Sequence, residues 1–131
     1  MSDPWKRKEV IGDCTLYLGS NEDILPAVSV DAVVTDPPYG INAAKKGTIG
    51  TSKNAKVKDY GASDWDSQPA SSEQISLIRA CSQHQIIFGG NYFHLPPSPC
   101  WLVWDKQNTG DFADCELAWT NLDKPVRLAL A

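Results

Sequence analysis

The sequence predicts an α/β fold whose sheet is mainly parallel. Strand and helix patterns alternate over the first two-thirds of the chain, and the clearest strand, residues 30–36, has a continuously apolar, β-branched centre. A run of this kind is typical of a strand that is covered on both faces, as in a parallel sheet. The 131 residues suffice for one hydrophobic core, so we expect a single domain, residues 1–131.

The N-terminal elements are expected to be short. Residues 10–13 predict a strand that stops at a turn. Ser20 is followed by acidic residues, a combination that marks the start of a helix. Pro26 limits that helix to one or two turns, because a proline inside a helix removes a backbone hydrogen bond.

A long polar loop, residues 41–69, follows the strand and is rich in Lys, Gly, Ser and Asp. Loops of this length without internal structure are uncommon unless they are functional or disordered. Ser71 and Gln74 then have capping-box spacing, and apolar residues recur at every third position behind them. These patterns predict a helix over residues 72–83.

Three further strands are expected after this helix. Residues 85–88 predict a second buried strand, which the pair Gly89-Gly90 ends. Beyond a proline-rich connector, residues 101–104 predict a third strand and residues 116–119 a fourth.

Bulk properties exclude some classes of protein. The net charge of −4 and the pI near 5.0 argue against a protein that coats nucleic acid by charge alone. The chain has neither the apolar segment of a signal peptide nor an apolar run as long as a membrane-spanning helix, so we expect a cytoplasmic protein without membrane contact. No metal site is expected, because Cys-x-x-Cys spacing is missing and the two histidines are scattered. We expect four buried or half-buried free thiols, on Cys14, Cys81, Cys100 and Cys115.

The motif Asp36-Pro37-Pro38-Tyr39 carries the sharpest chemical signal in the sequence. It directly follows the strand at 30–36, and in open α/β sheets ligands bind beyond the carboxyl ends of the strands. The alternative interpretation is an ordinary Asp-Pro turn with Tyr39 as a partly buried aromatic residue.

These residue types suit the binding of an exocyclic amine on adenine or cytosine. Such an amine is a poor nucleophile because its lone pair is delocalised into the ring, and acceptors for both amine hydrogens favour a more tetrahedral nitrogen. Asp36 supplies one acceptor, and a backbone carbonyl of the Pro-Pro stretch supplies another. The carbonyls point in set directions, because each proline fixes its own φ and favours an extended conformation in the residue before it. Tyr39 offers a flat face on which a base stacks, worth ~1–3 kcal/mol in nucleic-acid sites.

Residues 30–40 resemble the catalytic motif of amino-group DNA methyltransferases. Residues 87–93, 101–106 and 112–120 resemble the later strands of phage-borne members of that family. The resemblance implies a Rossmann-like S-adenosylmethionine-dependent methyltransferase fold, S-adenosylmethionine as the methyl donor, and a base flipped from double-stranded DNA. It implies adenine as the target, because Asp-Pro-Pro-Tyr is the adenine-type form of the motif.

The resemblance also assigns roles to residues. Asp36, Pro37, Pro38 and Tyr39 match the catalytic positions. Asp13 ends a strand where such folds often contact the adenosine of the donor, so Asp13 and Asp36 are candidate donor contacts; for Asp13 a simple turn residue is an equal alternative. The lysine-rich stretch after the motif lies where the family places a mobile segment over DNA, so phosphate contacts and a solvated loop are both open for Lys45, Lys46, Lys53, Lys56 and Lys58.

The chain departs from the family in one respect. The family binds its donor with a Phe-x-Gly-x-Gly turn, and Phe88-Gly89-Gly90-Asn91 has the wrong spacing for it. We therefore expect a truncated member with an incomplete fold, a half-built donor pocket and little or no activity alone. We further expect self-association, or pairing with a complementing C-terminal fragment, because an incomplete sheet leaves an edge and apolar surface uncovered.

Two other functions remain open. One is an amino-group methyltransferase that acts on ribosomal RNA or on a protein glutamine through a similar motif. The other is a non-catalytic nucleic-acid-binding remnant that uses Tyr39, Trp65 and the lysine-rich stretch.

Overall fold

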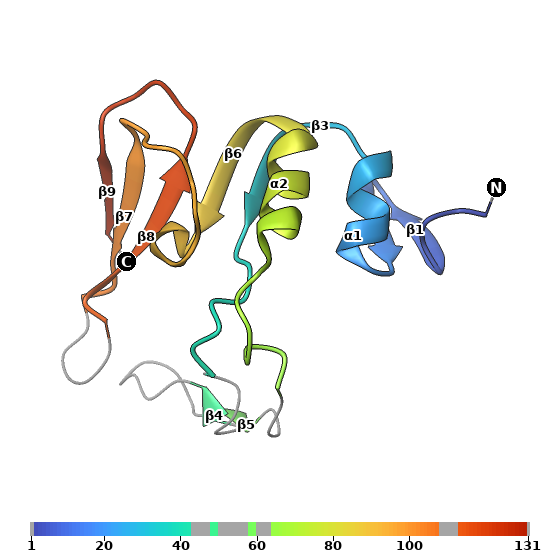
Figure 1. Cartoon of the computed structure of the whole chain (residues 1–131), viewed down its shortest axis with the longest axis horizontal. Coiled ribbons are helices and arrows are strands. Elements are labelled where there is room, and N and C mark those ends of the chain that lie inside the picture. Colours follow the sequence, from blue (N-terminus) through green and yellow to red (C-terminus); the bar gives the residue numbers. More distant parts are fainter. Residues whose placement is uncertain (1, 43–47, 50–57, 60–63, 108–112, 131) are drawn as a thin grey trace.

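The computed structural model describes residues 2–42, 48–49, 58–59, 64–107 and 113–130. The architecture is α/β: a five-stranded sheet carries the core, and short helices and two small two-stranded sheets accompany it (Figure 1). Among the helices that the structure describes, none has the length and apolar character needed to cross a membrane.

The N-terminal part is a β-hairpin followed by a short helix. β1 (Arg7–Ile11) and β2 (Cys14–Leu18) pair antiparallel, and Gly12 takes a positive φ of 58° in the two-residue turn between them. The predicted strand is thus confirmed, whereas β2 was not predicted. α1 (Asn21–Ile24) begins at the predicted cap, where Ser20 Oγ accepts the N–H of Glu22, and η1 (Leu25–Ala27) holds the proline that ends it.

The central sheet is mixed, so the prediction of a mainly parallel sheet is wrong. Its strands, in spatial order, are β3 (Val30–Thr35), β6 (Ser82–Phe88), β8 (Cys115–Thr120), β7 (Trp101–Asp105) and β9 (Arg127–Leu130). β3 pairs parallel with β6 and β7 pairs parallel with β9, but β8 runs antiparallel to both of its neighbours. The physical reason is the connection between β7 and β8: residues 106–114 are fewer than the dozen or so that a parallel crossover needs.

β3 is the edge strand of this sheet and is not covered on both faces, contrary to the expectation from its apolar run. Val33 packs against the core, whereas Val34 on the opposite face is 66% exposed. Among the described strands β3 pairs with β6 alone, and α2 packs on β6 on the face that Val33 shares. Part of the apolar surface of β3 is therefore exposed in the described fold.

α2 (Ser72–Ala80) joins the parallel strands β3 and β6. Its predicted capping box is present: the Gln74 N–H donates to Ser71 Oγ at 3.1 Å, and the Ser71 N–H donates to Gln74 Oε1 at 2.9 Å. The helix is three residues shorter than predicted, because the chain enters β6 at Ser82. Ile75 and Ile78 of α2 form the core with Ile87 and Trp119.

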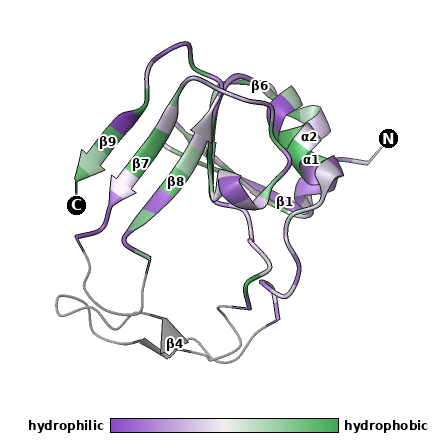
Figure 2. Ribbon diagram, turned by 60° about the vertical axis from the view of Figure 1, so that its left-hand side comes forward, coloured by the Kyte–Doolittle hydropathy of each residue, from purple (hydrophilic) through white to green (hydrophobic). Residues whose placement is uncertain are grey.

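The later strands confirm three predictions and add elements that were not predicted. The expected strands at 85–88, 101–104 and 116–119 all form, each slightly longer than its pattern. β9 was not predicted; its four residues are exposed although the strand is largely hydrophobic in Figure 2. The expected loop at 41–69 contains a short antiparallel pair, β4 (Thr48–Ile49) and β5 (Lys58–Asp59).

Candidate functional site at the carboxyl end of β3

The motif Asp36-Pro37-Pro38-Tyr39 leaves β3 at its carboxyl end, as predicted. Because β3 and β6 are parallel, with Thr35 opposite Ile87, the residues that follow β6 reach the same edge of the sheet. These residues are Gly89 and η3 (Gly90–Tyr92). Two chain segments about 50 residues apart in sequence thus meet beside the motif.

The ring of Tyr39 lies against both the backbone of Gly89 and the ring of Tyr92. The Tyr39 and Tyr92 rings are stacked, with centroids 4.8 Å apart and planes inclined by 11°. A Cβ placed on Gly89 would come within 2.0 Å of Tyr39 Cε1, and Gly89 also has a positive φ of 67°. Glycine is therefore favoured at position 89 for two reasons: the backbone has a positive φ, and the Tyr39 ring occupies the place of a Cβ.

The functional groups of Tyr39 and Asp36 meet each other. The Tyr39 hydroxyl donates to Asp36 Oδ1, and the Asp36 side chain is exposed at the rim of the sheet. Partial burial raises the pKa of Tyr39 well above its ordinary value, and the hydrogen bond to the Asp36 carboxylate and its negative charge raise that pKa further. At neutral pH the phenol is consequently a proton donor and Asp36 its acceptor.

The two prolyl carbonyls have different surroundings. The Pro38 carbonyl accepts the N–H of Ala70 at 3.0 Å, and Tyr39 forms a β-bridge with Pro69. Within the described residues no donor reaches the carbonyl of Pro37. Pro37 is itself buried, and its carbonyl is an acceptor beside Asp36 that the described residues leave unused.

Asp66 holds the backbone behind the motif, and sequence reasoning missed it. Its side chain is 3% exposed, and its Oδ1 accepts the N–H groups of Tyr39 and Gly40, both at 2.9 Å. The sequence offered no signal, because Asp66 is one of several acids in a polar loop. Trp65, the neighbouring candidate base contact, is 58% exposed.

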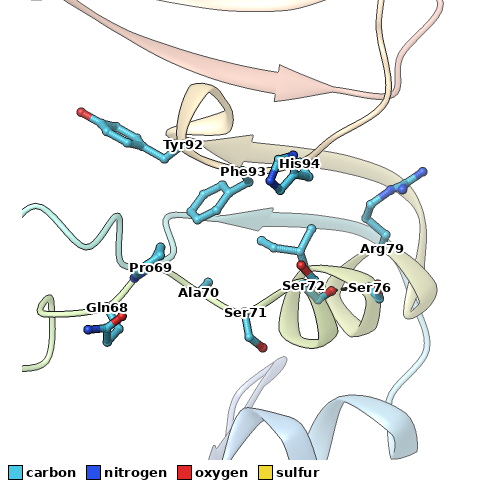
Figure 3. Close-up of a pocket in the computed structure, with 11 residues that line it drawn as sticks. Gln68, Pro69, Ala70, Ser71, Ser72, Ser76, Arg79, Tyr92, Phe93 and His94 are labelled. Carbon is cyan, nitrogen blue, oxygen red and sulfur yellow. Dashed lines mark hydrogen bonds between the residues drawn. The ribbon is translucent and has the colours of Figure 1, made fainter.

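A cavity of about 420 Å³ borders the site on its α2 side (Figure 3). Residues 92–94 form one side and residues 68–72, 75 and 76 the other, with Arg79 at one end. Pro69 and Tyr92 line the cavity and also contact Tyr39, whereas none of residues 36–39 lines it. The cavity is therefore a neighbour of the motif and a separate hollow.

The remaining predicted site residues lie elsewhere. Asp13 is exposed in the turn between β1 and β2, and in Figure 1 this hairpin lies on the side of α1 away from β3. Lys58 belongs to β5, where its backbone pairs with Ile49. The other predicted DNA contacts lie outside the described residues, namely Lys45, Lys46, Lys53 and Lys56.

The part of the chain that the structure describes contains no group of three or more His, Cys, Asp or Glu residues able to hold a metal ion. All four cysteines are free thiols, as expected. Cys14 is exposed, however, which corrects the expectation that it is at least half-buried, because both faces of its hairpin are exposed.

The glycines at this edge do not fit S-adenosylmethionine. A glycine turn holds a donor by leaving its backbone open to close approach. Here the Tyr39 ring covers Gly89, and a Cβ on Gly90 would come within 2.5 Å of the Trp119 Cβ. The turn after β6 thus packs against the protein's own aromatic residues.

Comparison of the chain with protein-family models, with curated proteins and with solved structures finds no match. Function must therefore be argued from the site itself, where the motif meets Asp66, Gly89 and Tyr92.

Proposed function

We propose that this chain supplies the base-binding half of an adenine-type DNA amino-group methyltransferase site. The observation that carries the proposal is the grouping of an exposed carboxylate on Asp36, an acceptor carbonyl on Pro37 and a stacked ring on Tyr39 at one strand end. S-adenosylmethionine as the methyl source belongs to the proposal through the family resemblance alone.

The chemistry of the proposal concerns the two hydrogens of the exocyclic amine. Asp36 accepts one of them and the Pro37 carbonyl accepts the other, so that the nitrogen lone pair turns away from conjugation with the ring. Both acceptors are fixed before the base arrives: Asp36 by the end of β3, and the Pro37 carbonyl by the Pro37 ring, which fixes φ, and by Pro38, which restricts ψ of the residue before it. Fixed acceptors at a reacting nitrogen lower the barrier because they need no reorganisation.

Tyr92 occupies the place that a base would take on Tyr39. Its ring stacks on Tyr39 at base-like separation, it is half-exposed, and it lies in the short η3 after two glycines. A base that displaces Tyr92 recovers a comparable stacking energy, about 1–3 kcal/mol. The second oxygen of the Asp36 carboxylate can accept the amine hydrogen, since the Tyr39 hydroxyl donates to Oδ1.

The proposal is tested by nucleotide titration under NMR, with tyrosine rings isotopically labelled. Deoxyadenosine monophosphate carries the exocyclic amine and thymidine monophosphate does not, so the first should shift the Tyr39 and Tyr92 signals at several-fold lower concentration. The variant Asp36→Ala should remove this preference, and Asp31→Ala, an exposed acid on β3, should keep it. Equal responses to both nucleotides in the unmodified chain would refute the proposal.

A second measurement addresses the reaction. Because the glycines after β6 are covered, we expect the isolated chain to bind S-adenosylmethionine more weakly than micromolar in calorimetry. Mass spectrometry of nucleosides from duplex DNA incubated with the isolated chain and donor should accordingly detect little or no N6-methyladenine or N4-methylcytosine. Micromolar donor binding together with either methylated base would contradict the expectation of an incomplete donor pocket.

A further inference from the structure

Asp66 is a buried carboxylate outside the motif and outside the strands of the sheet. Its Oδ1 accepts two N–H groups, from Tyr39 and from Gly40, and its backbone carbonyl accepts a third, from Asn42 at 3.0 Å. Tyr39 and Asp66 are 27 residues apart in the sequence. One residue therefore fixes three points along the turn that follows the prolines.

The local geometry supports a specific role for this carboxylate. A buried carboxylate is costly unless it is hydrogen-bonded, and N–H bonds to a charged acceptor are roughly twice as strong as neutral ones. Successive N–H groups directed at one oxygen form an anion-binding hollow in the backbone. Gly40 makes this hollow, since its φ is +75° and a Cβ there would come within 2.6 Å of Pro69 Cδ.

We infer that Asp66 is a positioning residue for the base-binding turn. It holds the backbone of Tyr39 and Gly40, and through them the stacking ring and the prolyl carbonyl before it. That the turn binds a base rests on the proposed function. That Asp66 fixes the backbone of this turn rests on the hydrogen bonds alone. Since Asp66 accepts the backbone N–H of Tyr39, its removal loosens the site without deleting a group that contacts the base.

Hydrogen exchange of individual amides tests the inference in three variants. Asp66→Ala removes the acceptor, Asp66→Asn retains an acceptor oxygen without the charge, and Asp64→Ala removes an exposed acid two residues away. In Asp66→Ala we expect the Tyr39 and Gly40 amides to exchange at least roughly tenfold faster and the Tyr39–Tyr92 ring-current shifts to shrink. Asp66→Asn should accelerate exchange by a smaller factor and preserve those shifts, and Asp64→Ala should change neither. The core amide of Ile87 should be unaffected throughout.

Unchanged exchange at Tyr39 and Gly40 in Asp66→Ala would overturn the inference. An equal rise at Ile87 would also overturn it, because Asp66 would then act on the fold as a whole. If Asp66→Ala does not fold, Asp66→Asn decides: faster exchange confined to the two amides supports the role, and unchanged exchange contradicts it.

The nucleotide titration separates this inference from the proposed function. If the unmodified chain does not prefer the amine-bearing nucleotide, the proposed function fails and the exchange result still stands. If the preference exists but the variants exchange as the unmodified chain does, the positioning role fails alone. If both hold, Asp66→Ala should weaken deoxyadenosine monophosphate binding several-fold, and Asp66→Asn should restore most of it.

Discussion

At the scale of single residues, Tyr39 contacts most of the other residues of the site. Its hydroxyl donates to the Asp36 carboxylate, and its ring lies against Gly89 and Tyr92. Both surroundings oppose ionisation of the phenol, because a phenolate would be partly desolvated and would face a like charge. The protonation state of Tyr39 therefore reports whether the site is assembled.

The raised pKa of Tyr39 predicts a particular pH dependence. Below pH 10.0, the ordinary value, the phenol is neutral in both the folded and the unfolded chain, so its contribution to stability is fully present. Above that pH the unfolded chain ionises first, and the folded state loses stability as the pH rises. We expect Tyr39→Phe to remove this part of the alkaline loss.

Absorbance titration at alkaline pH, compared with chemical denaturation, measures the effect. The spectrum of the unmodified chain minus that of Tyr39→Phe isolates the Tyr39 phenol, which should ionise later than an ordinary tyrosine. Tyr17→Phe, which removes a phenol from the hairpin, is the control and should leave the late phase in place. An ordinary titration for Tyr39 would show that it does not face Asp36.

Gly89→Ala should displace the Tyr39 ring. The new Cβ meets the ring, and the positive φ of Gly89 is strained for alanine, so we expect a loss of stability of more than about 1 kcal/mol. Gly12→Ala is a matched control, because Gly12 also has a positive φ but no atom of the described residues lies within 4 Å of its Cβ position. Only Gly89→Ala should abolish the Tyr39–Tyr92 ring-current shifts. If both variants abolish these shifts, a specific contact between Gly89 and the Tyr39 ring is contradicted.

The motif could be predicted from the sequence, and its partners could not. Asp36 to Tyr39 form one continuous stretch after an apolar strand, so the local sequence predicts both their chemistry and their place in the fold. Asp66, Gly89 and Tyr92 reach the site through the pairing of β3 with β6 and through a long loop. Their roles depend on contacts between distant segments, which no local pattern encodes.

At the scale of elements, α2 connects the core with the site. Its apolar face packs on Ile87 and Trp119, and the residue just before its cap, Ala70, donates its N–H to the Pro38 carbonyl. Figure 3 shows the start of this helix beside the cavity that borders Tyr92. Loosening the first turn of α2 therefore affects both stability and the motif.

Ser71→Ala should cost about 1 kcal/mol of unfolding free energy, because it removes the side-chain acceptor of the capping box. The neighbouring change Ser72→Ala is the control and should stay within roughly 0.5 kcal/mol, since the Ser72 side chain is exposed and outside the box. Urea denaturation of both variants gives the comparison. Equal losses would mean that the cap contributes nothing specific.

Element ends and pairings show where sequence patterns stop being informative. The helix predicted over 72–83 ends at Ala80 because β6 needs Ser82 to pair with Val30, a constraint set by another strand. The β8 pattern was recognised, but its insertion between β6 and β7 was not, since apolar residues do not specify a neighbour. β9 is another example: its residues are largely apolar, yet all four are exposed.

At the scale of the whole molecule, apolar side chains remain exposed at the open edge of the sheet and on the hairpin. Val34 on β3 is accompanied by Val10, Ile11, Leu16 and Leu18 on β1 and β2. Exposed apolar surface next to an unpaired strand edge favours association between chains. The expectation of self-association therefore stays a prediction, now with defined surfaces.

Light scattering over a wide concentration range should show a mass that rises above 14.3 kDa. Val34→Lys should reduce this rise, because a lysine on an edge strand opposes pairing with another chain. Gln83→Lys adds the same charge at an exposed polar position of β6 and should have little effect. A monomeric mass at every concentration would contradict the prediction.

The position of β8 has a consequence for synthesis on the ribosome. β8 is made after β7 but separates β7 from β6, so the two parts of the sheet have no common neighbour until residues 115–120 have emerged. Trp119, the largest fully buried side chain, arrives with the same strand. Ile87 and Trp101 lack the side chain that completes their core until then, so the two parts of the sheet can join only when synthesis of the chain is nearly finished.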